Sequence, residues 1–118
     1  MAQKEDLQQK FSELRMETVQ TRQQMKFLEG QIQLCKSTAK RAELTHKEVS
    51  GLPEETKLYR TVGRAFVLQG RKDIFDELTQ VQADSEKKIT DYQKQQETVQ
   101  KQLKSTEAAL REAVVKAK

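Results

Sequence analysis

Cysteine and histidine, which often act as a nucleophile and a general base, are scarce in this chain. It has one cysteine, Cys35, and one histidine, His46, and no Ser, Asp or Cys constellation surrounds the histidine. Cys35 falls on an apolar helical stripe, where a small buried hydrophobe is the ordinary interpretation. His46 falls at a predicted helix start, where a solvated side chain is expected. There is also no glycine-rich phosphate loop or metal-ligand spacing, so the sequence predicts a protein that is not an enzyme and holds no cofactor.

The second chemically distinctive feature is a cluster of five positive charges near the middle of the chain. No acid occurs between positions 57 and 72. The whole chain has a net charge of +4, but without these five, 17 of its 22 basic residues remain against 18 acidic ones. Such a cluster can bind nucleic acid or an acidic neighbouring subunit, and the lack of a recognisable DNA-reading helix favours the subunit. The cluster consists of Lys57, Arg60, Arg64, Arg71 and Lys72.

The composition indicates long helices more than a compact globule. Charged residues make up 34% of the chain and aromatic residues 5%, with four glycines, one proline and no tryptophan. Such a chain is typical of a coiled coil if its apolar residues are periodic, and of disorder if they are not. One cysteine cannot form an internal disulfide, which fits a reducing compartment. The sequence has neither a secretory signal nor an apolar run of membrane-spanning length, so we expect a cytoplasmic protein with no membrane partner.

Heptad periodicity predicts two long helices, and a capping signal predicts a short one between them. The first helix runs from about 4 to 43, and the second long helix runs from about 71 to 116. Between them, Thr45 and Glu48 match a capping box, which predicts a short helix over about 46–51 that ends before Pro53. The apolar seam of the first helix is Leu7, Phe11, Leu14, Thr18, Thr21, Met25, Leu28, Ile32, Cys35, Ala39 and Ala42. The seam of the second is Ile74, Leu78, Val81, Ser85, Ile89, Tyr92, Gln96, Val99, Leu103, Thr106, Leu110 and Ala113.

The two seams can pair as a long antiparallel two-helix coiled coil. We align Leu7 with Leu110, and this register places Thr21 opposite Gln96. Thr21 and Gln96 then form a polar layer, which either fixes the register or marks a point where the helices can splay. The fold is therefore predicted to be mainly α, with both chain ends at one end of the coiled coil.

The central segment from 58 to 69 has the β-branched and aromatic content of strands. Gly63-Arg64 fits a two-residue type II′ turn, because the first central residue of that turn has a positive φ. The resulting β-hairpin pairs Val62 with Ala65. An isolated hairpin is marginal in water and its edges are open, so we expect it to join hairpins of other chains in an oligomeric β-barrel. The residues assigned to subunit assembly are Leu58, Tyr59, Arg60, Val62, Arg64, Phe66, Val67 and Leu68.

Apolar residues also gather near the two ends of the chain. Met16, Val19, Val114 and Val115 lie off the seams, so one two-helix interface cannot bury all of them. Exposed apolar patches mark binding surfaces, and the alternative is frayed helix ends with scattered apolar residues. The residues assigned to this terminal surface are Leu7, Phe11, Leu14, Met16, Leu103, Leu110, Val114 and Val115.

The segment most specific to a known family covers Tyr59-Arg60-Thr61-Val62-Gly63-Arg64-Ala65-Phe66-Val67-Leu68-Gln69, with Leu44-Thr45 and Leu52-Pro53-Glu54-Glu55-Thr56 before it. It resembles the β-class subunits of prefoldin, and the resemblance extends over nearly the whole chain. The resemblance implies a single prefoldin-like domain over 1–118 and a place in a hetero-hexameric, ATP-independent cytosolic chaperone of α- and β-class subunits. It also implies that the hairpins build a double β-barrel. The coiled-coil tips would hold unfolded actin and tubulin and deliver them to the group II chaperonin.

Two functions of other classes remain open on the residues alone. A coiled-coil scaffold or tether without client binding would tolerate a fully polar terminal surface. A nucleic-acid-binding module would use the basic cluster and would lose its salt-dependent binding on charge reversal at Arg60 and Arg64.

Overall fold

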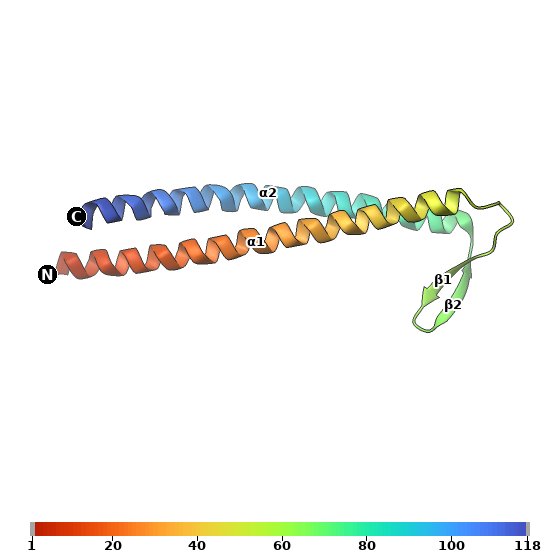
Figure 1. The fold of residues 1–118 in the computed structure, drawn as a ribbon, viewed down its shortest axis with the longest axis horizontal. Helices are drawn as coiled ribbons and strands as arrows, with labels where there is room; N and C mark the ends of the chain where they lie inside the picture. The colour runs from red at the N-terminus through yellow and green to blue at the C-terminus, as the bar shows by residue number, and fades with distance from the viewer. Residues whose placement is uncertain (1, 118) are drawn as a thin grey trace. The chain divides into compact units, whose positions relative to one another are not determined.

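The computed structural model describes residues 2–117 and is mainly helical. Helix α1 spans Ala2–Ser50 and helix α2 spans Arg71–Ala117, and between them strands β1 (Leu58–Val62) and β2 (Ala65–Gln69) form a β-hairpin (Figure 1). The predicted fold class, two long helices with a central β-hairpin, is confirmed. The chain divides into two compact units, each with a stretch of both helices. We call residues 2–32 with 91–117 the terminal unit, and residues 33–90 the hairpin unit.

Within each unit the helices meet along the predicted apolar seam. The seam forms because residues alternately three and four apart lie on one face of a helix. In the terminal unit the buried seam residues are Thr18, Thr21, Leu28, Ile32, Val99, Thr106 and Ala113. In the hairpin unit they are Cys35, Ala42 and Ser85. Val81, predicted on the seam, is 38% exposed, and Gln82 beside it is half-buried.

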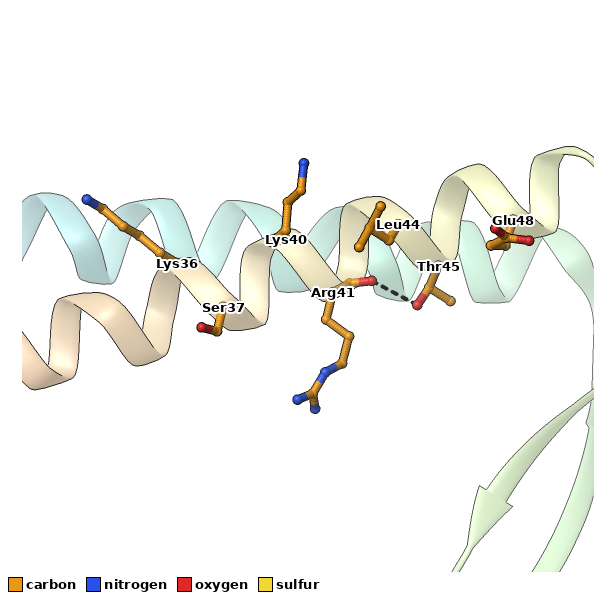
Figure 2. A pocket seen from close by; sticks show the side chains of 7 residues that line it. All are labelled: Lys36, Ser37, Lys40, Arg41, Leu44, Thr45 and Glu48. Carbon is orange, nitrogen blue, oxygen red and sulfur yellow. Dashed lines mark hydrogen bonds between the residues drawn. The ribbon is translucent and has the colours of Figure 1, made fainter.

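Helix α1 does not end near position 43, and the predicted short helix over 46–51 is wrong. One helix continues to Ser50. Thr45 is an interior helical residue whose hydroxyl donates to the carbonyl of Arg41 at 2.8 Å (Figure 2), the bond that threonines make within helices. The seam explains the difference, because His46 and Val49 continue its four- and three-residue steps beyond Ala42 and are half-buried. Packing of these positions outweighs a local capping signal.

The environment of His46 also differs from the prediction of a solvated side chain. Its imidazole is half-buried and lies against the ring of Phe75 in α2, with ring centroids 4.5 Å apart and an angle of 34° between the planes. The Ser50 hydroxyl donates to the His46 carbonyl at 2.7 Å, and its oxygen also lies 3.4 Å from Nδ1 of the ring. His46 is therefore a packing residue between α1 and α2 in the hairpin unit.

The alignment of the two helices differs from the predicted register. That register places Glu107 opposite Lys10, twelve residues or about 18 Å along the axis from Arg22. In the structure an Oε1 atom of Glu107 lies 3.0 Å from Nη2 of Arg22. The contacts of Thr106 with Glu17 and of Gln96 with Glu29 fit a register displaced by about one heptad, with Thr18 opposite Thr106, and this register brings Arg22 and Glu107 within reach of each other. Heptad seams repeat themselves, so the sequence predicts that the helices pair but not which layers meet.

The β-hairpin follows the predicted register. Its partners are Leu58↔Gln69, Tyr59↔Leu68, Arg60↔Val67, Thr61↔Phe66 and Val62↔Ala65. Gly63 has φ of 60°, in the left-handed region that glycine enters without a steric cost. No heavy atom lies within 4 Å of where a Cβ on Gly63 would stand, so the backbone angle and not crowding calls for glycine there.

Candidate interaction surfaces

The β-hairpin exposes nearly all of its side chains. Among the residues predicted for assembly, Leu58 is half-buried and the other seven are exposed, Phe66 to 72% and Leu68 to 61%. Within residues 2–117 the sheet consists of β1 and β2 alone, so each strand has one edge without a partner strand. Figure 1 shows the hairpin leaving the helices where α1 ends and α2 begins, with its turn standing clear of both. Apolar side chains on open strands are the features of a surface that another chain covers.

The two faces of the hairpin differ in what they contact. Side chains alternate across a strand, so Arg60 and Gln69 share one face. Both bind the same carboxylate of α2: Oε1 of Glu77 accepts from Nη1 of Arg60 at 2.9 Å and from Nε2 of Gln69 at 2.8 Å. The opposite face carries Tyr59, Thr61, Phe66 and Leu68, all exposed.

The predicted basic cluster is partly used within the chain. Arg60 is paired with Glu77. Arg71 is half-buried, and its Nη2 donates to the carbonyls of Leu52 at 2.9 Å and Pro53 at 2.6 Å, so it holds the segment that follows α1. The three other basic residues of the cluster, Lys57, Arg64 and Lys72, are exposed.

The terminal surface is partly exposed, as its predicted role requires. Of its eight residues, Leu7, Phe11, Leu14, Leu103 and Leu110 are half-buried on the seam. The others lie off the seam and are exposed, Met16 to 64%, Val114 to 39% and Val115 to 70%. The guanidinium of Arg15 lies 5.9 Å from the centre of the Phe11 ring, so a charge borders the apolar side chains. Val19, which lies beside this surface in the sequence, is 54% exposed.

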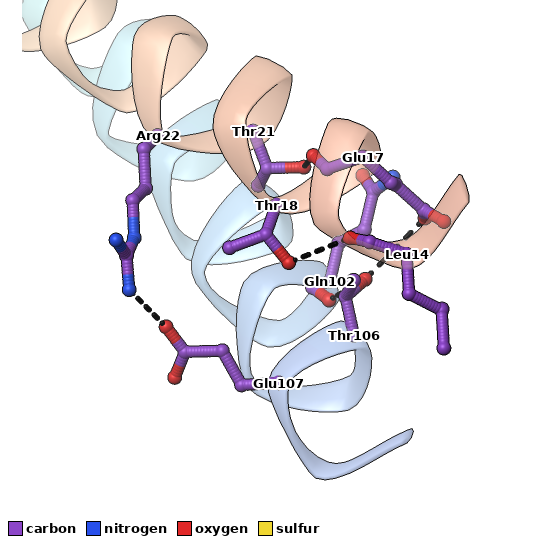
Figure 3. A network of polar contacts seen from close by, with 8 residues as sticks. All are labelled: Leu14, Glu17, Thr18, Thr21, Arg22, Gln102, Thr106 and Glu107. Atoms are coloured by element: carbon purple, nitrogen blue, oxygen red, sulfur yellow. Dashed lines mark hydrogen bonds and ion pairs between the residues drawn. The ribbon is translucent and has the colours of Figure 1, made fainter. Parts of the chain in front are cut away.

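Polar residues occupy the most buried positions next to the terminal surface (Figure 3). Thr18, Thr21 and Thr106 are each at most 6% exposed. Their hydroxyls donate to carbonyls four residues earlier in their own helix, and that of Thr106 also lies 3.3 Å from Oε1 of Glu17. The predicted polar layer of Thr21 and Gln96 is not formed through a mutual bond, because Gln96 donates to Glu29 at 2.9 Å. Threonines bury less hydrocarbon than leucines would, so these layers hold the helices together less strongly.

A shallow depression on the outward face of α1 lies in the hairpin unit (Figure 2). Its lining residues include Lys36, Lys40 and Arg41, together with Leu44, which is 51% exposed. Every lining residue comes from α1, and Lys40 is 3.7 Å from the carboxylate of Glu43. No nucleophile and general base converge here.

Among residues 2–117, His, Cys, Asp and Glu form no group of three or more that could hold a metal ion. No helix over the same residues is long and apolar enough to span a membrane. Cys35 is a buried, free thiol on the seam, as the sequence predicts.

The family of this chain follows from its similarity to known proteins. The sequence profile of the prefoldin subunit family matches residues 2–117. The chain belongs to this family. Proteins named prefoldin subunit 1 are similar to it throughout: those of Danio rerio and Homo sapiens are 32% and 33% identical, over 93% of this chain and 90% of theirs. That of Arabidopsis thaliana is 33% identical over 86% of this chain and 80% of its own.

A solved structure shares the fold of this prefoldin family member. The crystal structure of the prefoldin beta subunit from Thermococcus strain KS-1 superimposes with a TM-score of 0.74, at 21% identity, over 92% of this chain and 91% of that one. The resemblance of the sequence to prefoldin is therefore confirmed, and the chain has the fold of a prefoldin beta subunit. Family membership makes the chain a component of a prefoldin chaperone that assembles with other prefoldin subunits.

Proposed function

We propose that this chain is one subunit of a cytoplasmic, hetero-hexameric, ATP-independent chaperone, and that it holds unfolded proteins with its terminal surface. Membership of the prefoldin family supports the chaperone role. The observation that supports client binding is the exposure of the terminal surface, whose eight apolar residues remain exposed or half-buried in the folded chain. The resemblance to prefoldin supports unfolded actin and tubulin as clients and the group II chaperonin as the recipient.

The β-hairpin is the proposed assembly element, and its charge favours different neighbours over identical ones. Lys57, Arg64 and Lys72 are exposed, so copies of this chain around one barrel would bring like charges together. Like charges at an interface disfavour association, and an acidic neighbour reverses the sign. The proposed neighbours are α- and β-class subunits with acidic hairpins or loops.

The terminal surface is suited to weak, repeated contacts. Covering one large apolar side chain stabilises a complex by ~1.5–3 kcal/mol before the cost of ordering the client. One surface of this size binds an unfolded chain weakly. Several surfaces tethered to one barrel bind more tightly, because each bound surface raises the effective concentration of the next.

A client-protection assay with surface variants tests this function. The terminal variant replaces four exposed apolar residues with glutamine, which keeps helix propensity: Met16, Val19, Val114 and Val115. The matched control makes the same change at Leu34 and Leu44, which are 61% and 51% exposed elsewhere on α1. Each variant is co-expressed with partner subunits, and denatured actin is diluted into the assembled complex while light scattering is recorded.

The proposed function predicts that both variants assemble and that the terminal variant alone protects less. The loss is expected to be partial, because the other subunits keep their own surfaces. Equal protection by wild type and terminal variant would favour the alternative function, a coiled-coil scaffold that binds no client.

A further inference from the structure

The two faces of the β-hairpin are not equivalent. The face with Arg60 and Gln69, which we call the tied face, is held to α2 by two hydrogen bonds to a single oxygen of Glu77, at 2.9 and 2.8 Å. We call the opposite face, with Tyr59, Thr61, Phe66 and Leu68, the free face. The free face has no charged residue and presents Tyr59, Phe66 and Leu68 at 57%, 72% and 61% exposure. On the tied face, Val62 and Val67 are exposed to 54% and 50%.

We infer that Glu77 determines which face of the hairpin enters the subunit interface: it holds the Arg60 face toward α2, and the face with Tyr59, Thr61, Phe66 and Leu68 packs against a β-hairpin of another prefoldin subunit. The inference rests on the proposed role of the hairpin in assembly. It adds which of the two faces is buried and which residue selects it. Glu77 lies outside the hairpin and is not among the residues that the sequence assigns to subunit assembly.

The chemistry of the free face indicates what kind of partner covers it. An uncharged face with two large rings and a leucine needs an apolar partner surface. The unpaired N–H and C=O groups along both strand edges need another strand, because a buried backbone group without a partner is costly. A β-hairpin of another subunit supplies apolar side chains and a strand edge together, whereas a helix supplies only the side chains.

A pair of neighbouring substitutions distinguishes the faces. Phe66→Asp places a charge on the free face, and Val67→Asp places the same charge one residue later on the tied face, with the same effect on strand propensity. Each full-length variant is co-expressed with partner subunits, and assembly is measured by sizing chromatography and dissociation on dilution. The inference predicts that Phe66→Asp weakens assembly by about 100-fold or more and Val67→Asp by less than about fivefold.

The role of Glu77 needs a measurement of hairpin position as well as of assembly. Spin labels at Arg64→Cys and Lys87→Cys, in a Cys35→Ala background, report the distance from the hairpin turn to α2. Glu77→Ala should broaden this distance distribution and weaken assembly roughly three- to tenfold, the range of an exposed ion pair with one further hydrogen bond. Glu77→Gln keeps an acceptor oxygen and should restore the narrow distribution. Asp76→Ala, at an exposed carboxylate on the same turn, should leave both measurements unchanged.

The outcomes separate this inference from the proposed function. If Val67→Asp disrupts assembly as much as Phe66→Asp, or alone disrupts it, the face assignment is wrong and assembly through the hairpin stands. If neither variant changes assembly, the hairpin is not a principal contact and the proposed function loses its assembly element. If Glu77→Ala leaves the label distances unchanged, Glu77 does not position the hairpin.

Discussion

The imidazole of His46 lies against the ring of Phe75, with their centroids 4.5 Å apart, and this contact joins α1 to α2 in the hairpin unit. His46 lies four residues beyond Ala42 on the seam, so its contact with Phe75 continues the pairing of the two helices almost to Ser50. Stacked aromatic rings contribute ~0.5–1.5 kcal/mol beyond the apolar area that they bury.

Removing this ring pair should destabilise the hairpin unit. Phe75→Ala is expected to lower the free energy of unfolding by ~1–2 kcal/mol, since Phe75 is half-buried. A double-mutant cycle with His46→Ala should give a coupling free energy between the two rings of ~0.5–1.5 kcal/mol. Urea unfolding followed by circular dichroism measures both quantities. Phe27→Ala is the control, because Phe27 is 62% exposed, and a loss at Phe27 equal to that at Phe75 would contradict the role of the pair.

The same substitution at two glycines should have opposite effects. Gly63 has φ of 60°, where an alanine is strained, so Gly63→Ala should destabilise the hairpin by ~1 kcal/mol. Gly30 lies within α1 at an exposed position, and nothing lies within 4 Å of a Cβ added there. Gly30→Ala should therefore stabilise the chain by ~1 kcal/mol. Thermal unfolding of the two variants side by side measures the sign of each change in stability. If Gly30→Ala destabilised the chain, α1 would need glycine at that position.

The buried threonines near the terminal surface should limit the stability of the terminal unit. Thr106→Leu replaces a hydroxyl with hydrocarbon at a position that is 5% exposed, and it should raise the free energy of unfolding by ~1 kcal/mol. Amide hydrogen exchange over 2–32 and 91–117 should slow. Thr98→Leu, at an exposed position of α2, is the matched control and should change neither measurement. Faster exchange in Thr106→Leu would show that the threonine layer stabilises the unit.

The exposed positive charge at the hairpin turn should affect which subunits associate. Arg64→Glu is expected to weaken the complex with partner subunits about tenfold at low ionic strength, and by less at high salt, because salt screens exposed charges. Lys88→Glu on α2 makes the same change in net charge away from the hairpin and should have little effect. Sizing chromatography at two salt concentrations measures assembly. A stable homo-hexamer of the wild-type chain at low ionic strength would contradict the preference for acidic neighbours.

The features that sequence reasoning predicted correctly depend on short-range patterns. Gly63-Arg64 specifies the turn, and the turn specifies every pair of the hairpin register. The seams follow from residue spacing alone. The continuation of α1 through Thr45 was not predicted, because a local capping motif competes there with packing against Phe75, which lies far away in the chain. The sequence does not align the two helices either, because a seam displaced by one heptad still matches apolar with apolar.

The assignment of surface residues from sequence was incomplete for a similar reason. The sequence identifies both apolar faces of the hairpin, but it does not tell which face is turned toward α2. That depends on Glu77, seventeen residues after Arg60 in the chain and 2.9 Å from it in space. Charged residues are common on the polar face of an amphipathic helix, so Glu77 gives no signal of this role by itself.

Site-specific crosslinking tests the central claim, that the terminal surface holds unfolded proteins, most directly. A photoreactive amino acid is placed at Met16 or at Val115 of the terminal surface, and at Lys88 of α2 as an exposed control in the hairpin unit. Each variant is assembled with its partner subunits, mixed with denatured actin and irradiated, and the yield of crosslinked actin is measured by gel electrophoresis. The account predicts strong crosslinking from positions 16 and 115 and a yield near background from position 88. Equal yields from all three positions, or crosslinking from position 88 alone, would contradict it.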